Sequence, residues 1–507
     1  MTLHVGAEPY LTGRQEGAST AWRRLPWLAL AVLFAIAIAV RLFLPANTDV
    51  SWLLTVAERV LDGQRLYAEV IETNPPMAVL IYMPGVVIAR SLGLPAEMVT
   101  DGLVFAAVFA SLAIAARILK DSTALDRRAA WPFALLAFAI LAILPAKTFG
   151  QREHIAVVEL LPILALYAVR TTGERPALWK IAIAGMGAGL ALSFKPNFAL
   201  GVLGGLAALA FHARSWRLLW VPENWIAGAL VAIYAVCVVW LFPAYMSDIV
   251  PLMRHVYVLV GASFAEMVRT PALPIWAAAG FAALVMRRSE RIDAILLLLL
   301  ATSFGFMLAF FVQRKGWPYH SYPMIAFAML GLGYAVTANA RRDRALNVFG
   351  MATLAIAFIA SIGWFNWAFD KAFDPRPLWA TVARLGPHPR ILAITGEPGL
   401  GHPMVRALRG TWVSRQQGLW VAGYARNLRS RGVLDSRQEA ILEQYAARER
   451  AMLIADIGKT EPTVVLVDNF SDHWSTWLAD HPDVADLLKD YRLVATINDI
   501  EVRAKAR

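Results

Sequence analysis

The stretch LPWLALAVLFAIAIAVRLFL (residues 25–44), followed directly by PANTDVSW (residues 45–52), decides the fold class of this chain. An apolar run of this kind matches the roughly 20 residues that a helix needs to cross a bilayer. It is too long for the apolar part of a cleaved signal peptide, and no clear small-residue cleavage site follows it. We therefore predict a first transmembrane helix over 25–44, preceded by a cytoplasmic tail of residues 1–24.

The composition is that of a polytopic membrane protein. Of the 507 residues, 58% are hydrophobic and 17% are charged, whereas a soluble domain carries about 25% charged residues. The net charge of +11 comes from short basic clusters between apolar runs. This is the pattern of cytoplasmic loops rather than of a nucleic-acid-binding surface. Cys237 is the single cysteine, so internal disulfides are excluded, and it lies in an apolar run.

Apolar segments of span-like length recur along the first two thirds of the chain and predict a bundle of about eleven spans. The stretch 76–92 is also apolar, but it is short and is broken by Pro84 and Gly85. The predicted spans are 25–44, 98–118, 131–147, 155–170, 178–194, 198–213, 223–243, 273–287, 292–312, 319–338 and 346–368.

Five basic clusters decide how the stretch 76–92 is placed. In short loops, Lys and Arg favour the cytoplasmic side of the membrane. All five clusters can lie there only if segment 44–98 crosses an even number of times, which makes 76–92 a surface or re-entrant helix. The N-terminus is then cytoplasmic and the C-terminus outside, whereas a spanning 76–92 would place all five clusters outside. The clusters are Arg117/Lys120/Arg127/Arg128, Arg170/Arg175/Lys180, Arg214/Arg217, Arg287/Arg288/Arg291 and Arg341/Arg342/Arg344.

The chain divides into a cytoplasmic tail (1–24), a transmembrane module (25–369) with an outer loop (45–97), and an extracytoplasmic domain (370–507). The last part is richer in charge, and its apolar runs end in polar turns. The sequence thus predicts a mostly α fold, a membrane helical bundle with outward juxtamembrane helices and a small C-terminal α/β domain. The elements expected in that domain are strands over 391–396 and 463–468, helices over 434–455 and 474–490, and one or two strands within 491–502.

Asp49 is the first candidate for a functional residue. A carboxylate beside a membrane span is costly to bury in hydrocarbon and usually serves a function; a solvated loop acid is the alternative. Apolar residues at helical spacing follow it and stop at Asp62-Gly63, which predicts an amphipathic helix on the membrane surface. Pro75-Pro76 then impose an extended turn. The polar residues between that helix and the prolines are Tyr67, Glu72 and Asn74.

Three further polar clusters fall on the same outward side. Arg152 can fork two donors onto a phosphate, and Lys195 has no charged neighbour in sequence and so needs an anion or a water path. Snorkelling at the interface is the alternative for both. His154 is a candidate metal ligand, but no spaced His or Glu partner completes a site, so a metal is left open. The clusters are Gln151, Arg152, Glu153 and His154; Lys195; and Arg314, Lys315, Tyr319 and His320.

An acid together with several cations at a membrane surface suits chemistry on a lipid phosphate. The cations would hold the phosphate and stabilise it as a leaving group. The carboxylate would deprotonate an incoming hydroxyl.

On these residues the chain resembles the membrane glycosyltransferases of the C superfamily, most of all the protein O-mannosyltransferases and lipid A aminoarabinose transferases. The resemblance covers the transmembrane module. It departs from the family where Val50 follows Asp49, a place at which members often carry a second acid, and where Asn74 precedes the prolines in place of a basic residue or histidine. The residues that carry it are Asp49, Leu61-Asp62-Gly63, Tyr67, Pro75-Pro76, Gln151-Arg152-Glu153, Lys195, Lys315, Tyr319-His320 and Pro323.

The resemblance implies an enzyme that moves a sugar, with inversion, from a polyprenyl phosphate to a glycan, lipid or protein acceptor at the outer face of the cytoplasmic membrane. Asp49 would be the base, and the basic residues named above would contact the donor phosphate. Two alternatives stay open. A transporter or flippase would carry charges near the bilayer midplane and an internal repeat, whereas a polysaccharide polymerase or ligase, or a scaffold of related architecture, would share the outward cations.

Overall fold

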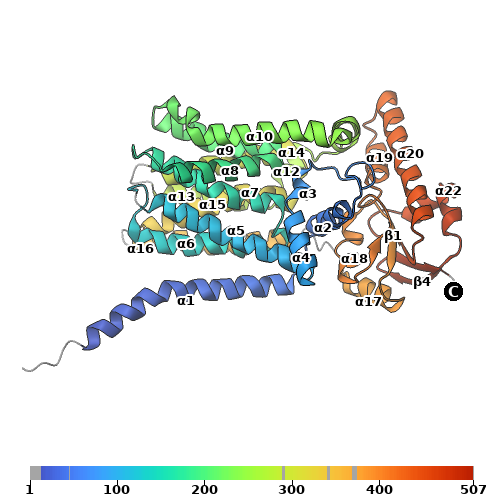
Figure 1. Ribbon diagram of the computed structural model, residues 1–507, viewed down its shortest axis with the longest axis horizontal. Helices are drawn as coiled ribbons and strands as arrows, with labels where there is room; N and C mark the ends of the chain where they lie inside the picture. The colour runs from blue at the N-terminus through green and yellow to red at the C-terminus, as the bar shows by residue number, and fades with distance from the viewer. Residues whose placement is uncertain are drawn as a thin grey trace, which may run out of the picture.

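The computed structural model describes residues 13–44, 46–120, 122–287, 292–339, 343–367 and 374–505. Figure 1 shows a helical bundle with an α/β domain seated on one end, and three short helices, α2, α3 and α4, between the two. The predicted fold class, a polytopic bundle with a C-terminal α/β domain, is confirmed. The proposed domain boundary at residues 369/370 lies outside the described residues.

Each of the eleven predicted spans coincides with a helix of the bundle. Six of these helices, α1 (from Leu25), α5, α10, α14, α15 and α16, are long and apolar enough to cross a membrane. The central helix α15 is mostly buried, whereas α10 exposes most of its apolar surface at the edge of the bundle, as a lipid-facing helix does. The helices are α1 (Gly13–Phe43), α5 (Ala96–Leu119), α6 (Arg127–Ala142), α7 (Arg152–Arg170), α8 (Leu178–Phe194), α9 (Ala199–His212), α10 (Pro222–Leu241), α13 (Ala272–Met286), α14 (Ala294–Gln313), α15 (Pro318–Asn339) and α16 (Arg344–Trp367).

The outer loop 45–97 holds α2 (Thr48–Leu61), α3 (Met77–Leu80) and α4 (Met83–Leu92). The helix predicted after Asp49 is present, and Asn47 caps it by accepting hydrogen bonds from the backbone N–H groups of Asp49 and Val50. It does not lie on an open surface, because the C-terminal domain covers it and residues 50–57 are buried. The predicted surface helix 76–92 is two short helices, with a break before the first turn of α4, where Pro84 lies.

The segment 244–272, which connects α10 and α13, is largely helical. It contains η4 (Tyr245–Ile249), α11 (Val250–Leu252), η5 (Met253–Tyr257) and α12 (Phe264–Val268). Val256 of η5 packs on Val421 and Leu428 of the C-terminal domain. This contact holds segment 244–272 against that domain.

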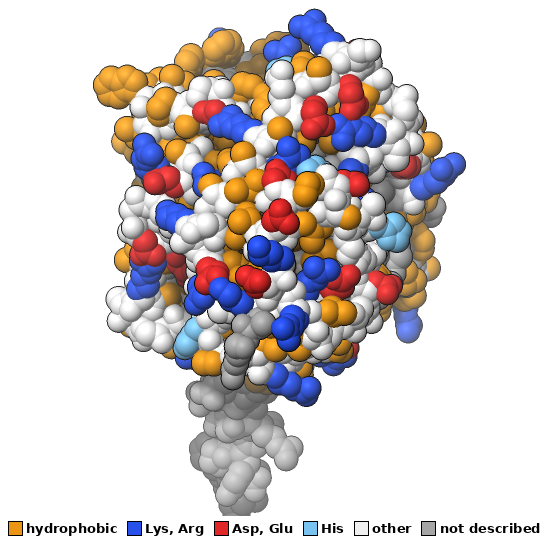
Figure 2. All heavy atoms as spheres, turned by 90° about the vertical axis from the view of Figure 1, so that its right-hand side faces the viewer, with side chains coloured by type: hydrophobic (Ala, Val, Ile, Leu, Met, Phe, Trp, Pro, Cys, Tyr) orange, Lys and Arg blue, Asp and Glu red, His pale blue; other side chains and the backbone are white. Residues whose placement is uncertain are grey.

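The C-terminal domain is built on a five-stranded sheet in the order β2-β1-β3-β5-β4. The first three strands are parallel, and β4 and β5 form an antiparallel hairpin. Viewed from this domain, acidic and basic side chains are interspersed over the surface (Figure 2), as on a face in contact with water. Its elements are α17 (Arg376–Arg384), β1 (Arg390–Ile394), η6 (Pro398–Leu400), α18 (Met404–Ala407), β2 (Thr411–Trp412), α19 (Trp420–Ser430), α20 (Ser436–Lys459), β3 (Val464–Asp468), β4 (Tyr491–Ile497) and β5 (Ile500–Lys505).

One predicted element of this domain was wrong. The single helix expected over 474–490 is divided into α21 (Trp474–Ala479), α22 (Pro482–Ala485) and η7 (Asp486–Leu488). Pro482 has no backbone N–H to donate, and its ring excludes the preceding helical turn, so the helix ends before it.

Arg406 links the C-terminal domain to the bundle. Its guanidinium donates to both carboxylate oxygens of Glu58 in α2, at 2.6 and 2.8 Å, and also to Glu97 in α5. The Arg406 side chain is only 11% exposed. Bidentate pairing of this kind adds geometric specificity to charge attraction.

We expect Arg406→Met to destabilise the folded protein by about 2 kcal/mol, because two partly buried carboxylates lose their cation. Arg376→Met is the matched control, since Arg376 forms an exposed ion pair with Asp374 and its loss should leave stability nearly unchanged. Thermal unfolding in detergent measures both variants. Equal unfolding temperatures would contradict a role for Arg406 in holding the domains together.

Candidate active site

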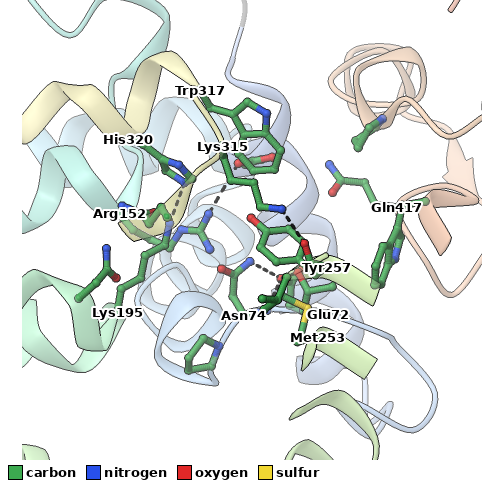
Figure 3. A pocket seen from close by; sticks show the side chains of 18 of the residues that line it. Glu72, Asn74, Arg152, Lys195, Met253, Tyr257, Lys315, Trp317, His320 and Gln417 are labelled. Carbon is green, nitrogen blue, oxygen red and sulfur yellow. Dashed lines mark hydrogen bonds and ion pairs between the residues drawn. The ribbon is translucent and has the colours of Figure 1, made fainter. Parts of the chain in front are cut away.

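A cavity of about 680 Å³ lies between the C-terminal domain and the end of the bundle next to it. All four polar clusters singled out in the sequence reach it (Figure 3). They come from the start of α2, the loop before α3, the start of α7, the end of α8 and the α14–α15 turn. The predicted site residues that line it are Asp49, Glu72, Asn74, Arg152, Lys195, Arg314, Lys315, Tyr319 and His320.

The described residues hold Asp49 through one of its two carboxylate oxygens. Its Oδ2 accepts a hydrogen bond from Gln151 Nε2 at 3.2 Å and lies 3.6 Å from Arg152 Nη2. Gln151 also donates to the Asn47 side chain, which caps α2 and so fixes where Asp49 begins the helix. Oδ1 has no hydrogen-bond partner among the described residues, and the Asp49 side chain is 26% exposed. A carboxylate oriented in this way can accept a proton from a ligand in the cavity.

Arg152 is the most deeply buried cation of the site. Its side chain is 3% exposed, and Nη2 faces Asp49. Within the described part of the chain, Nε and Nη1 have no hydrogen-bond partner. Leaving donors of a buried charged group unsatisfied is costly. The position is therefore one that an anion would stabilise.

Lys195, Glu153 and His320 form a second buried group beside Arg152. Lys195 Nζ donates to Glu153 Oε1 at 2.5 Å and lies 3.3 Å from His320 Nε2. Figure 3 shows Lys195 and His320 meeting on the same side of the cavity as Arg152. Lys195 follows the end of α8 in extended conformation, because Pro196 begins the next helical turn. Glu153 does not line the cavity, and it acts by positioning Lys195.

Lys315 approaches the cavity from the opposite wall. Its ammonium group donates to the backbone carbonyls of Tyr257, at 2.7 Å, and Val260, and it lies 3.7 Å from the centre of the Tyr257 ring. Partial burial, together with the charge of neighbouring Arg314, lowers the pKa of Lys315 to about 8. Arg314 itself adopts the left-handed conformation and donates to Ala262. This hydrogen bond fastens the α14–α15 turn to segment 244–272.

Glu72, Asn74 and Tyr67 shape the wall of the cavity. Glu72 Oε1 accepts hydrogen bonds from the backbone and side chain of Asn74, and Oε2 accepts one from the Trp52 indole at 2.5 Å. Tyr67 lies outside the cavity and donates to the Asn74 carbonyl at 2.7 Å. These bonds hold the chain just before Pro75-Pro76.

His154 does not line the cavity, and its ring nitrogens are not available to a metal, which corrects the expectation that it is a candidate metal ligand. Gly150 N donates to its Nδ1 at 3.0 Å, and its Nε2 bonds the Leu141 carbonyl at 2.7 Å, so both ring nitrogens are engaged inside the protein. It is fully buried and stabilises the turn before α7. Among the described residues, no group of three or more His, Cys, Asp or Glu side chains could hold a metal ion.

Sequence reasoning missed several residues that line the cavity. Arg254 and Tyr257 come from segment 244–272, and Gln417, Trp420 and Tyr424 come from the C-terminal domain. These residues are far from Asp49 in sequence, so no local pattern indicated that they lie near it. The aromatic residues of segment 244–272 are a signal that could have drawn attention to Tyr257.

The fold and the site together define a class of protein, the multi-pass membrane proteins with a basic cavity between one end of the helical bundle and an α/β domain. Among solved structures, the chain matches ArnT from Cupriavidus metallidurans bound to undecaprenyl phosphate, with a TM-score of 0.58, 14% identity, and coverage of 96% of this chain and 98% of that one. The apo form of the same protein matches with a TM-score of 0.58 and 12% identity, at the same coverage. The arabinofuranosyltransferase AftD from Mycobacteria matches with a TM-score of 0.47 and 16% identity, over 96% of this chain and 40% of that one.

The likeness to ArnT establishes the fold. The ArnT match spans both the bundle and the C-terminal domain, so the bundle fold predicted from the resemblance is confirmed. No protein-family model matches the chain. No curated protein sequence matches it either.

Proposed function

We propose that this chain is an integral membrane glycosyltransferase that moves a sugar from a polyprenyl-phosphate donor to an acceptor at the outer face of the cytoplasmic membrane. The N-terminus would be cytoplasmic and the C-terminal domain outside. One observation carries the proposal: Asp49 and the cations Arg152, Lys195 and Lys315, drawn from four distant segments, line a single cavity. ArnT, which shares the fold, has been solved with undecaprenyl phosphate bound.

The cavity suits a lipid phosphate. Five basic side chains line it, against two acidic ones, so an anion is favoured. Arg152 offers phosphate oxygens two nitrogens that have no partner among the described residues, and Lys195 lies beside it. On the rim, Val258 and Val312 are 64% and 65% exposed and provide an apolar path for an isoprenoid chain.

The proposed step is a displacement at the anomeric carbon. The acceptor oxygen forms a bond to that carbon while the bond from carbon to the phosphate oxygen breaks, and polyprenyl phosphate leaves. The acceptor proton passes to Asp49 Oδ1, the oxygen without a partner among the described residues. Arg152 and the lysines stabilise the negative charge that develops on the phosphate.

The two alternatives predict different products. A polysaccharide polymerase or ligase would transfer a glycan chain rather than one sugar. A transporter or flippase would move its substrate without forming a glycosidic bond. Proteoliposomes incubated with a panel of radiolabelled polyprenyl-phosphate monosaccharides test all three, because only the proposed enzyme releases polyprenyl phosphate and adds a single labelled sugar to an acceptor. Label movement without release of polyprenyl phosphate would exclude the proposal.

We expect binding of undecaprenyl phosphate to weaken as the pH rises through about 8. The pKa of Lys315 is lowered to about 8 by burial. Its ammonium group is therefore charged below that pH and loses its charge above it. A bound phosphate would move this transition upward. Lys315→Arg should keep binding constant to higher pH, because a guanidinium does not deprotonate in this range; identical pH profiles for the two proteins would show that Lys315 does not contact the phosphate.

A further inference from the structure

A second cavity, of about 480 Å³, lies on the C-terminal-domain side of Asp49. It shares with the first cavity the residues that separate the two, among them Asp49, Lys315 and Tyr424. The C-terminal domain adds Glu397 and Arg431. The buried cations Arg152 and Lys195 line the first cavity only, so a group that reaches Asp49 through the second cavity does not pass them.

The charge balance of the second cavity differs from that of the first. Three basic side chains, Arg314, Lys315 and Arg431, stand against three acidic ones, Asp49, Glu266 and Glu397. A cavity with no net charge gives no advantage to a phosphate or other anion. Its carboxylates are hydrogen-bond acceptors, which suit hydroxyl groups.

Aromatic rings form a continuous band along the boundary between the two cavities. The Tyr424 ring lies 5.7 Å from Trp420 and 6.2 Å from Tyr257, and Trp317 lies 6.2 Å from Tyr257 and 5.7 Å from Tyr319. Trp420 and Tyr424, at the start of α19, are only partly buried. Partly exposed aromatic faces beside hydrogen-bonding groups are the surfaces on which the C–H face of a sugar ring packs.

The carboxyl end of β1 in the C-terminal domain lies at this cavity, because Gly396, Glu397 and Pro398 line it. Glu397 follows β1, at the point where β2 lies to one side of β1 and β3 to the other. In open α/β sheets, ligands bind at the carboxyl ends of strands where the order reverses in this way. Glu397 Oε1 accepts a hydrogen bond from Gly399 N, and Oε2 has no partner among the described residues. A Cβ built on Gly399 would lie 3.7 Å from Thr48, so this edge sits directly over the start of α2, next to Asp49.

We propose that the second cavity is the acceptor site and that it binds an uncharged glycan, with a sugar ring packed on Trp420 and Tyr424 and hydroxyls bonded to Glu397. This rests on the proposed function. The acceptor hydroxyl loses its proton to Asp49, and its oxygen bonds to the anomeric carbon as the donor phosphate departs from the opposite side. The donor then enters from the basic cavity and the acceptor from the neutral one.

The acceptor preference tests this site. Neutral octyl glycosides, their phosphorylated counterparts and an octylated peptide are offered to the protein in proteoliposomes with the radiolabelled donor panel. We expect transfer to the neutral glycosides, and Trp420→Ala and Glu397→Gln should each raise the acceptor KM by about tenfold or more. Glu397 lines the second cavity and not the first, so Glu397→Gln should also leave affinity for undecaprenyl phosphate unchanged. Phe470→Ala is the matched control, an aromatic residue of the same domain that lines neither cavity.

Binding of the neutral octyl glycosides is also measured without donor, by saturation-transfer NMR on wild type, Trp420→Ala and Phe470→Ala. Loss of the signal in Trp420→Ala alone supports the site. Preference for the phosphorylated glycosides or the peptide, or an acceptor KM unchanged by both substitutions, would overturn it. If wild type binds neutral glycosides but not undecaprenyl phosphate, the proposed function fails and the glycan site stands.

Discussion

Asp49→Asn reduces sugar transfer from a polyprenyl-phosphate donor by about 10²- to 10⁴-fold, the range lost when a general base is removed. The amide keeps the size of the side chain and can still contact Gln151 and Arg152, so the protein should insert and fold. It cannot take the proton from the acceptor hydroxyl. Initial rates in proteoliposomes at saturating donor measure the effect, and binding of undecaprenyl phosphate should stay within a few fold.

Asp62→Asn is the control for this substitution. Asp62 lies at the opposite end of α2, pairs with Arg90, and its side chain is 60% exposed. Because it is outside both cavities, its variant should transfer at the wild-type rate. Full activity of Asp49→Asn, with Asp62→Asn equally active, would rule out Asp49 as the base.

Arg152→Lys should lower transfer by about 10²-fold, although the positive charge is kept. Nε and Nη1 of Arg152 have no partner among the described residues, and a planar fork of donors suits a phosphate in a way that a single ammonium group does not. The shorter reach of lysine would also alter the contact with Asp49. Affinity for undecaprenyl phosphate should fall together with the rate, and both are measured on the purified variant.

Arg90→Lys provides the comparison, because Arg90 is an exposed arginine of α4 paired with Asp62. It should leave rate and lipid affinity unchanged. If Arg152→Lys behaves in the same way, Arg152 is a structural cation that balances Asp49 and Glu153, and phosphate recognition must lie with Lys195 and Lys315.

Much of the fold could be predicted from local patterns. Apolar length located a helix at each of the eleven predicted spans, and six of these helices are long and apolar enough to cross a membrane. The surface placement of 76–92, which rests on loop charge, stays a prediction. The two central strands of the C-terminal domain were also found, because short apolar runs ending in polar turns are a local signal. The error at 474–490 came from reading helical spacing through Pro482.

The candidate site could be predicted only in part. Residue type and predicted topology indicated that Asp49, Arg152, Lys195 and Lys315 lie on one side of the membrane. In the structure, all four line one cavity. The same reasoning grouped His154 with them. The sequence pattern of a polar residue at the end of a span is the same whether its side chain faces a ligand or the protein interior. Its two internal hydrogen bonds appear only in three dimensions.

By itself, the sequence determined that this is a multi-pass membrane protein with a soluble α/β domain, because the free energy of placing each segment in water or lipid depends on that segment alone. Tertiary structure decided that α2 is covered rather than exposed, that the described residues hold Asp49 through one of its two carboxylate oxygens, and that Trp420 and Tyr424 of the C-terminal domain complete the cavities. These properties arise from contacts between residues more than a hundred positions apart. Such contacts depend on how whole helices and domains pack, and no local pattern encodes them.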